Sequence, residues 1–260
     1  MKKVDKLRLM SKTDIPFPQA GLTVTQPSIY DISYAGEDYV MKGAKILLIN
    51  KNSIDSEDKV ALDNMTNFEI LLKLIRDKDP NVKLTVSFAM LTLQLLFPNY
   101  KVDLTNDNQL RFTNISDSSD MHFVNKTNFQ ELQFIIGSVF CLNEDLEEME
   151  SYERMGEMAK KIAEKLKKRH QKLNSLKEKP EDEVESVFAD IASILSIGNH
   201  MDINTIVQYS IYQLLDQFKR FQLKQAFDID IIVLSNGGKL DREPTNWLEM
   251  STTDKKGKST

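Results

Sequence analysis

Few residues in this chain have the types and spacing that catalysis or metal binding requires. The three histidines, His122, His170 and His200, form neither HExxH nor any other metal-ligand spacing, and Cys141 is the only cysteine. The sequence contains neither a GxSxG motif nor a glycine-rich phosphate loop. Because these motifs are absent, we predict no catalytic residues, no metal site and no cofactor. Their absence favours a protein that is not an enzyme.

The clearest candidate for binding chemistry is a basic segment, residues 156–179. Its apolar positions follow helical spacing, which predicts an amphipathic basic helix with a narrow apolar stripe. Lysines can neutralise phosphates, but no aromatic side chain in the segment could stack on bases, and acidic clusters flank it. A solvated or intramolecularly paired helix, a helix bound to a partner protein, and a nucleic-acid contact remain open, and nucleic acid is the least favoured. The candidate partner-binding lysines are Lys160, Lys161, Lys165, Lys168 and Lys172.

A second candidate surface is the apolar series from Ile203 to Leu234. Its three- and four-residue steps predict one long helix after an N-cap at Asp202, roughly 45 Å long at about 1.5 Å per residue. Such a helix can be a core helix, a face that receives another helix, or both. The candidate partner-binding side chains here are aromatic: Tyr209, Tyr212, Phe218, Phe221 and, beyond the series, Trp247.

Local signals place further elements in the first half of the chain. Thr66 and Glu69 form a capping-box pattern before an apolar run, and another helix is predicted from Pro80 until Pro98. Alternating residues from 100 to 112 predict a β-hairpin. A capped helix is then predicted from Thr127. Another helix is predicted from Val184, with its C-terminal cap at Gly198.

These elements predict a mostly α protein of the α+β class. Two helical lobes, with one small β-hairpin, are expected to be joined by a charged helical bridge. The expected units are an extended N-terminal arm (1–27), an N-terminal α+β lobe (28–145), the charged bridge with its basic amphipathic helix (146–183), a C-terminal helical lobe (184–250) and a polar tail (251–260).

The composition excludes several classes of protein. The chain has 260 residues, of which 41% are hydrophobic and 28% charged, so a wholly disordered protein is excluded. No stretch has the length and apolarity of a membrane-spanning helix, and the N-terminus has no apolar core of a signal peptide. The net charge of -5 argues against a protein whose whole surface binds nucleic acid. We therefore expect no membrane contact.

Three stretches taken together resemble a known kind of protein. They are PSIYDISYAGEDYVMKGAKILLI (27–49), GEMAKKIAEKLKKRHQKL (156–173) and SILSIGNHMDINTIVQYSIYQLLDQFKRFQLKQAFDIDIIVLSNG (193–237), which is followed by NWLE. The pattern resembles the tail assembly chaperones and baseplate-hub assembly proteins of long-tailed bacteriophages of Gram-positive hosts. The resemblance is one of general pattern, so no catalytic residue is carried over from it.

This resemblance implies a non-enzymatic role. Such proteins bind the helical tape measure protein or hub components and keep them soluble until the tail tube polymerises, in the cytoplasm of the bacterial host during infection. Alternatives are a structural component of the virion tail or baseplate, and a nucleic-acid-binding regulator that uses the basic helix. A homo-oligomer also stays open.

Overall fold

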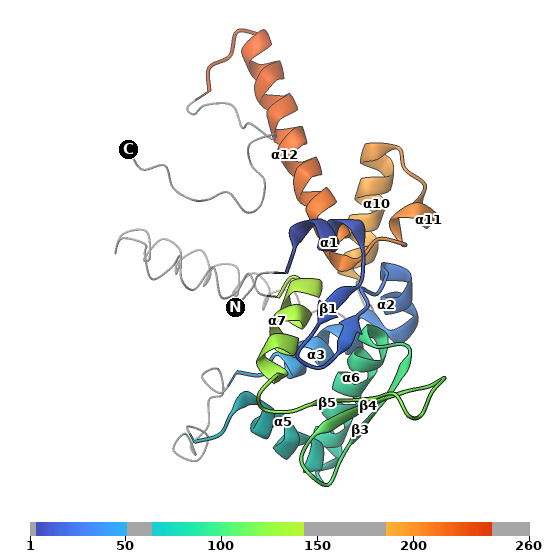
Figure 1. The fold of residues 1–260 in the computed structure, drawn as a ribbon. Coiled ribbons are helices and arrows are strands. Elements are labelled where there is room, and N and C mark those ends of the chain that lie inside the picture. The colour runs from blue at the N-terminus through green and yellow to red at the C-terminus, as the bar shows by residue number, and fades with distance from the viewer. Residues whose placement is uncertain (1–3, 51–63, 143–185, 241–260) are drawn as a thin grey trace, which may run out of the picture.

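The computed structural model describes residues 4–50, 64–142 and 186–240. About 57% of these residues are helical, and two small antiparallel sheets complete the fold, which confirms the mostly α, α+β class. The helices are α1 (Lys6–Ser11), α2 (Ile29–Ala35), α3 (Glu37–Leu47), α5 (Asn67–Arg76), α6 (Pro80–Leu96), α7 (Phe129–Val139), α10 (Val187–Asn199), α11 (Ile203–Ile206) and α12 (Ile211–Ser235). The strands are β1 (Ile15–Phe17), β2 (Leu22–Val24), β3 (Tyr100–Leu104), β4 (Leu110–Asn114) and β5 (Met121–Val124) (Figure 1).

The N-terminal segment differs from the extended arm that its prolines predicted. After α1, strands β1 and β2 form a hairpin in which Ile15 pairs with Val24 and Phe17 with Leu22. These four side chains are buried, whereas Pro16 points outward between them. The apolar residues at alternate positions supply enough buried surface to fold the segment onto the body, and proline is tolerated on the outer side of this edge hairpin.

The N-terminal body is a set of helices flanked by the three-stranded sheet. The predicted capping box is confirmed, because Thr66 and Glu69 exchange hydrogen bonds at the start of α5. The helix predicted from Pro80 is confirmed as α6. The predicted cap at Thr127 is wrong: α7 has Asn128 at its N-cap, and the Thr127 hydroxyl donates to Asn125 Oδ1 instead.

The predicted hairpin is confirmed as β3 and β4, and β5 adds a third strand to it. The sheet order is β3-β4-β5, with Val102 opposite Phe112 and Leu110 opposite Val124. Leu110, Phe112 and Val124 are buried and face the helices.

The prediction of one long helix from Ile203 is wrong, because this segment forms two helices, α11 and α12. Asp202 does cap α11, but a turn follows and Ser210 begins α12 with a capping box to Gln213. The turn is fixed by α2: the backbone N–H groups of Ile29 and Tyr30 donate to the carbonyl oxygens of Tyr209 (2.8 Å) and Val207 (2.9 Å). These two carbonyl groups point toward α2 and do not accept from the residues four positions later, as they would in a continuous helix.

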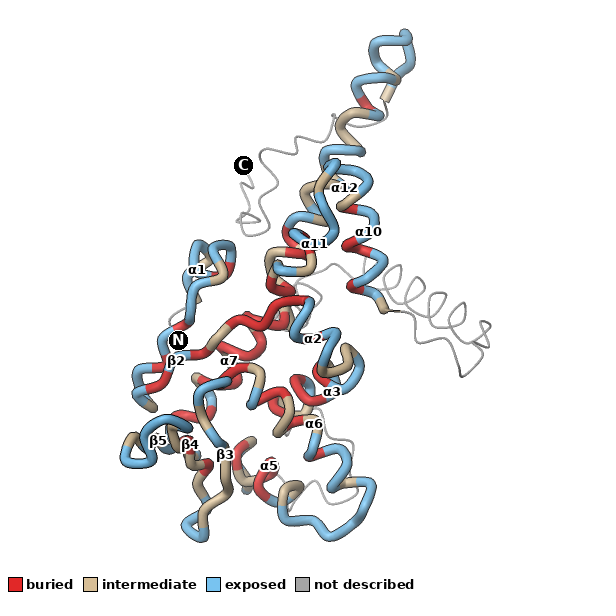
Figure 2. Tube along the Cα trace, turned by 90° about the vertical axis from the view of Figure 1, so that its right-hand side faces the viewer, coloured by how far each residue is buried: buried red, intermediate tan, exposed pale blue. Residues whose placement is uncertain are grey.

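One hydrophobic core runs through both parts of the described chain. Ile206, Ile211 and Leu214 of the C-terminal part belong to the same buried cluster as Phe17 and Ile32 of the N-terminal part. Figures 1 and 2 show that α12 is buried at its start and then projects away from the body, with α10 beside its first half. The expected charged bridge and polar tail lie outside the described residues. In the described ranges, no helix has the length and apolar character needed to cross a membrane.

Candidate protein-binding surface

Helix α10 carries apolar side chains on two faces. Phe188, Ile191, Ala192 and Leu195 recur at three- and four-residue steps and are buried in the core. Val187, Ile194 and Ile197 recur in the same way on another face and are exposed, Ile197 by 75%. We call these three residues the α10 stripe. A helix that is apolar on both faces but covered on one is typical of a surface that meets another protein.

Helix α10 packs against α12 near the C-terminal end of the α10 stripe. Gly198 of α10 contacts the ring of Phe221, and a Cβ atom on Gly198 would stand 2.3 Å from Cε2 of that ring. Ile194 precedes Gly198 by one helical turn, so it lies on the same side. The predicted C-terminal cap at Gly198 is wrong, because α10 continues to Asn199 and His200 takes the left-handed cap position with φ 55°.

The projecting end of α12 extends this apolar surface. Leu214 is buried in the core, and Phe218 and Phe221 follow it at helical steps in half-buried positions. Ile229 and Ile232 continue the series beyond the reach of α10 and are each 58% exposed. Together with Ile231 and Leu234, which are also exposed, they form what we call the α12 tip.

A groove lies between α2, α10 and α11. Its volume is about 370 Å³, and apolar side chains predominate in its lining, among them Ile29, Ile32, Ala192, Ile203 and Val207. We call it the α2–α10 groove.

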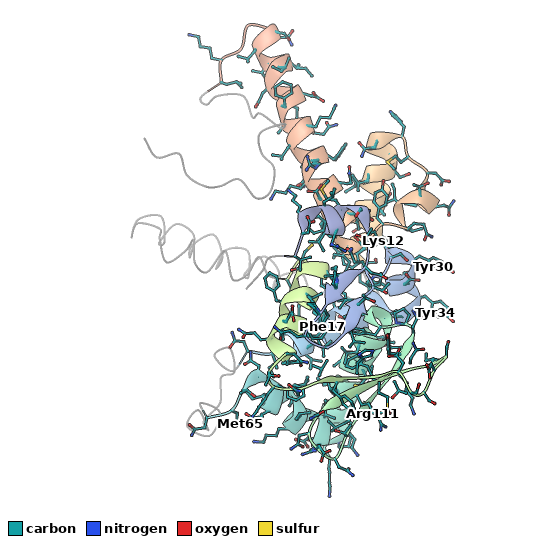
Figure 3. The ribbon with its side chains drawn as sticks, in the orientation of Figure 1. Lys12, Phe17, Tyr30, Tyr34, Met65 and Arg111 are labelled. Atoms are coloured by element: carbon teal, nitrogen blue, oxygen red, sulfur yellow. The ribbon has the colours of Figure 1, made fainter. Side chains whose placement is uncertain are left out.

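Two exposed tyrosines belong to α2, one of the helices that form this groove. Tyr30 and Tyr34 project from α2 into solvent (Figure 3), and Tyr34 is 89% exposed. Tyr30 follows the lining residue Ile29, and Tyr34 follows the lining residue Ser33. Successive residues of a helix lie about 100° apart, so both exposed rings are on the face of α2 next to the one that lines the groove.

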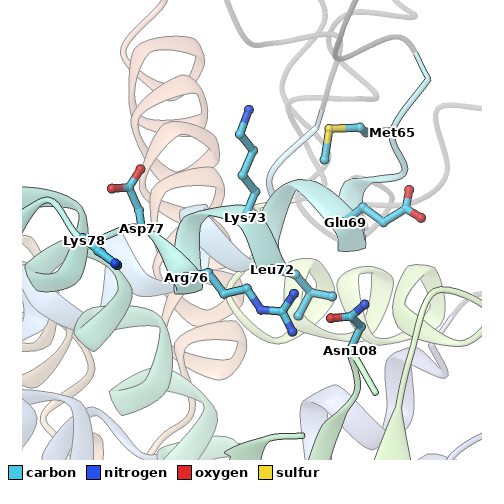
Figure 4. Close-up of a pocket in the computed structure, with 8 residues that line it drawn as sticks. All are labelled: Met65, Glu69, Leu72, Lys73, Arg76, Asp77, Lys78 and Asn108. Carbon is cyan, nitrogen blue, oxygen red and sulfur yellow. The ribbon is translucent and has the colours of Figure 1, made fainter. Parts of the chain in front are cut away.

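A wider hollow of about 650 Å³ lies along α5 (Figure 4). Lys73 and Arg76 line it, but in Figure 4 their side chains point in different directions, Arg76 toward Asn108. Both cations occupy the last turn of α5, where basic side chains stabilise the negative end of the helix dipole. Their positions have a structural explanation that needs no ligand.

Titratable side chains are dispersed rather than gathered. His122 Nδ1 lies 2.9 Å from the carbonyl oxygen of Ala20, and its Nε2 lies 2.8 Å from Asp120 Oδ1, so this ring links β5 to the β1–β2 turn. Desolvation, with the charge and hydrogen bond of Asp120, raises the pKa of Tyr100. Within the described ranges, no three His, Cys, Asp or Glu side chains are grouped as a metal site would need.

The aromatic residues singled out from the sequence are half-buried. Tyr209, Tyr212, Phe218 and Phe221 all pack against the core, and the Tyr209 hydroxyl lies 3.8 Å from Met201 Sδ. Their contacts connect α12 to α10 and to the body. The five candidate lysines and Trp247 lie outside the described residues.

Sequence reasoning did not single out the exposed aliphatic residues. A signal for them was present, because residues 187–197 have more apolar positions than one helix face can hold.

Residues 178–252 match a family model described as the YomV second domain. The matched region contains α10, α11 and α12, and with them the α10 stripe and the α12 tip. The family is of a Bacillus phage type, so the match suggests a phage protein. No curated protein and no solved structure matched the chain.

Proposed function

We propose that this chain is a non-enzymatic assembly factor of a phage tail or baseplate. It binds a helical client, the tape measure protein or a hub protein, and keeps that client soluble during tail assembly. The observation that carries the proposal is the exposed apolar surface formed by the α10 stripe and the α12 tip. The family match to residues 178–252 supports a phage setting, and the sequence resemblance supports a role in the tail or baseplate.

The surface has a form that suits a helical client. The α10 stripe and the α12 tip lie on two helices that pack together through Gly198 and Phe221, so a client helix laid beside them would contact both. Burying one aliphatic side chain of this size contributes about 1.5–3 kcal/mol. The side chains that one client helix covers contribute this free energy against the cost of association.

The proposal is tested by coexpression with the tape measure and hub proteins, followed by affinity purification. We expect a stoichiometric complex with one of them, and at least a tenfold loss of it in the double variant Ile194→Asp/Ile197→Asp. The matched control is Leu84→Asp/Ile115→Asp, which changes two exposed aliphatic residues elsewhere, on α6 and after β4. No complex with any of these proteins, or an equal loss in the control, would overturn the proposal.

A second measurement separates a transient factor from a structural component of the virion. Quantitative mass spectrometry would compare purified particles with infected-cell lysate. An assembly factor is abundant in lysate and absent from particles. A fixed copy number in every particle would instead make the exposed faces permanent interfaces of the tail or baseplate.

A further inference from the structure

We infer that the α2–α10 groove binds a cationic amphipathic helix of the partner. This inference rests on the proposed function and names the chemistry of the client segment. The observation behind it is a one-sided charge distribution: residues 28–41 and 186–218, which include every residue that lines the groove, contain no lysine and no arginine. The same stretches carry the acidic residues Asp31, Glu37, Asp38, Asp190, Asp202 and Asp216.

Cations from other elements neutralise only some of these acids. Lys42 pairs with Asp38 at 2.5 Å, and Arg220 pairs with Asp216 at 2.7 Å. Lys12 interacts electrostatically with Asp31, while its Nζ donates to the carbonyl oxygen of Gln208 at 2.6 Å.

Three further acids form no ion pair among the described residues, and each lies at the start of a helix. Glu37 accepts a hydrogen bond from the Ser186 hydroxyl, and Asp202 accepts from the backbone N–H and side-chain amide of Asn204. Neutral donors stabilise a carboxylate without cancelling its field. Asp190 lies exposed in the first turn of α10.

The arrangement of charge and apolar surface defines the occupant. Glu37 lines the α2–α10 groove, whose remaining lining is neutral and mostly apolar. An aliphatic side chain of the partner would enter the groove, and lysine or arginine side chains beside it would meet the acids. The exposed rings of Tyr30 and Tyr34 offer faces over which the same cations can stack. An acidic helix with an equal apolar stripe would be repelled.

The test uses fluorescence anisotropy on the full chain with two synthetic helical peptides of equal length. Both have the same leucine stripe, flanked by lysine in one peptide and by glutamate in the other. We expect the lysine peptide to bind at least tenfold more tightly, and to lose most of that advantage between low and high salt, because salt screens exposed charges. Equal affinities would overturn the inference and leave the proposed client binding through the apolar faces intact.

Variants locate the binding. Glu37→Gln/Asp190→Asn should weaken binding of the lysine peptide at least fivefold. Ser193→Arg places a positive charge at the groove, which repels the lysines of the peptide, and should abolish its binding. The matched control, Asp14→Asn/Asp107→Asn, removes two exposed acids that do not line the groove and should bind as wild type. Circular dichroism would verify that each variant is folded. Wild-type affinity in the groove variants would overturn the inference.

Other occupants give different results. If a second copy filled the groove, the chain would self-associate and the lysine peptide would dissociate the oligomer. If the chain's own residues 156–179 filled it, the peptide would bind only after Lys160, Lys161, Lys165, Lys168 and Lys172 were changed to glutamine. Either result would overturn a partner helix as the occupant.

Discussion

Gly43 of α3 lies directly against the carbonyl oxygen of Phe88 in α6. A Cβ atom on Gly43 would stand 2.1 Å from that oxygen and 2.2 Å from Thr92 Oγ1. The Thr92 hydroxyl is within hydrogen-bond distance of the carbonyl oxygens of Val40 (3.1 Å) and Phe88 (2.9 Å), so it joins the two helices at the same point. The helices α3 and α6 therefore meet backbone to backbone.

Replacing Gly43 with alanine should destabilise the fold. Alanine is the better helix former, but here its methyl group must displace backbone, and overpacking of this kind costs roughly 1–3 kcal/mol. Gly198→Ala is the matched comparison, because its methyl group meets only the outer atoms of the Phe221 ring, which can turn aside. Urea denaturation should show a clearly larger loss for Gly43→Ala, and equal effects would contradict the backbone contact.

Ser210→Ala should lower the free energy of unfolding by about 0.5–2 kcal/mol, because it removes the N-cap of α12. The Ser210 side chain is fully buried and accepts from the backbone N–H of Gln213 at 3.3 Å. Ser87→Ala serves as a control, since Ser87 is exposed inside α6 and its hydroxyl bonds only to Leu84 of the same helix. A thermal melt in which the two variants unfold together would show that the cap contributes nothing.

The capping box of α5 should make stability depend on pH. The backbone N–H and hydroxyl of Thr66 donate to Glu69 and lower the pKa of its carboxyl from the ordinary 4.5. A lowered pKa means that the folded state favours the charged form, so the stabilisation is present above pH 4.5 and is lost as pH falls through the lowered value. The deficit of Glu69→Ala in urea denaturation should thus be largest near neutrality and shrink in acid. A deficit independent of pH would contradict this.

Arg220→Ala should lower the free energy of unfolding by more than the loss of an exposed ion pair would. Arg220 Nε donates to Asp216 Oδ2 at 2.7 Å, Asp216 is buried, and its Oδ1 has no hydrogen-bond partner. Removing the arginine leaves a buried carboxylate unpaired, at a cost of about 1–3 kcal/mol. Asp216→Asn in the same background should recover part of the loss. The exposed pair Lys224–Asp228 has the same spacing, and Lys224→Ala should cost less than about 1 kcal/mol.

Sequence reasoning succeeded where the signal was local. The Thr66–Glu69 capping box and the two prolines around α6 each fix an element boundary through neighbouring backbone atoms alone. It failed at the N-terminal hairpin, which is held by burial against residues distant in sequence. The break before α12 had a visible signal, the Ser210–Gln213 capping-box pattern, but the apolar periodicity that runs through it favoured one continuous helix.

The candidate surface was predictable only in part. Periodicity shows that α10 has apolar residues on two faces, but only the packing of α10 on the body decides that Ile191 is buried and Ile197 exposed. The same holds for Phe218 and Phe221, whose half-burial depends on the contact between α10 and α12. Side chains with equal hydrophobicity thus differ in role because of their tertiary neighbours.

The β-bridge between Ser28 and Ser210 pairs two residues that the ribosome makes at different times. A ribosome adds roughly 5–20 residues per second, so Ser28 is made about 9–36 s before Ser210. Throughout that interval the backbone N–H groups of Ile29 and Tyr30, and the core side chains that Leu214 will cover, have no native partner. The nascent chain must therefore pass through a period in which its first half is complete in sequence but unfinished in structure.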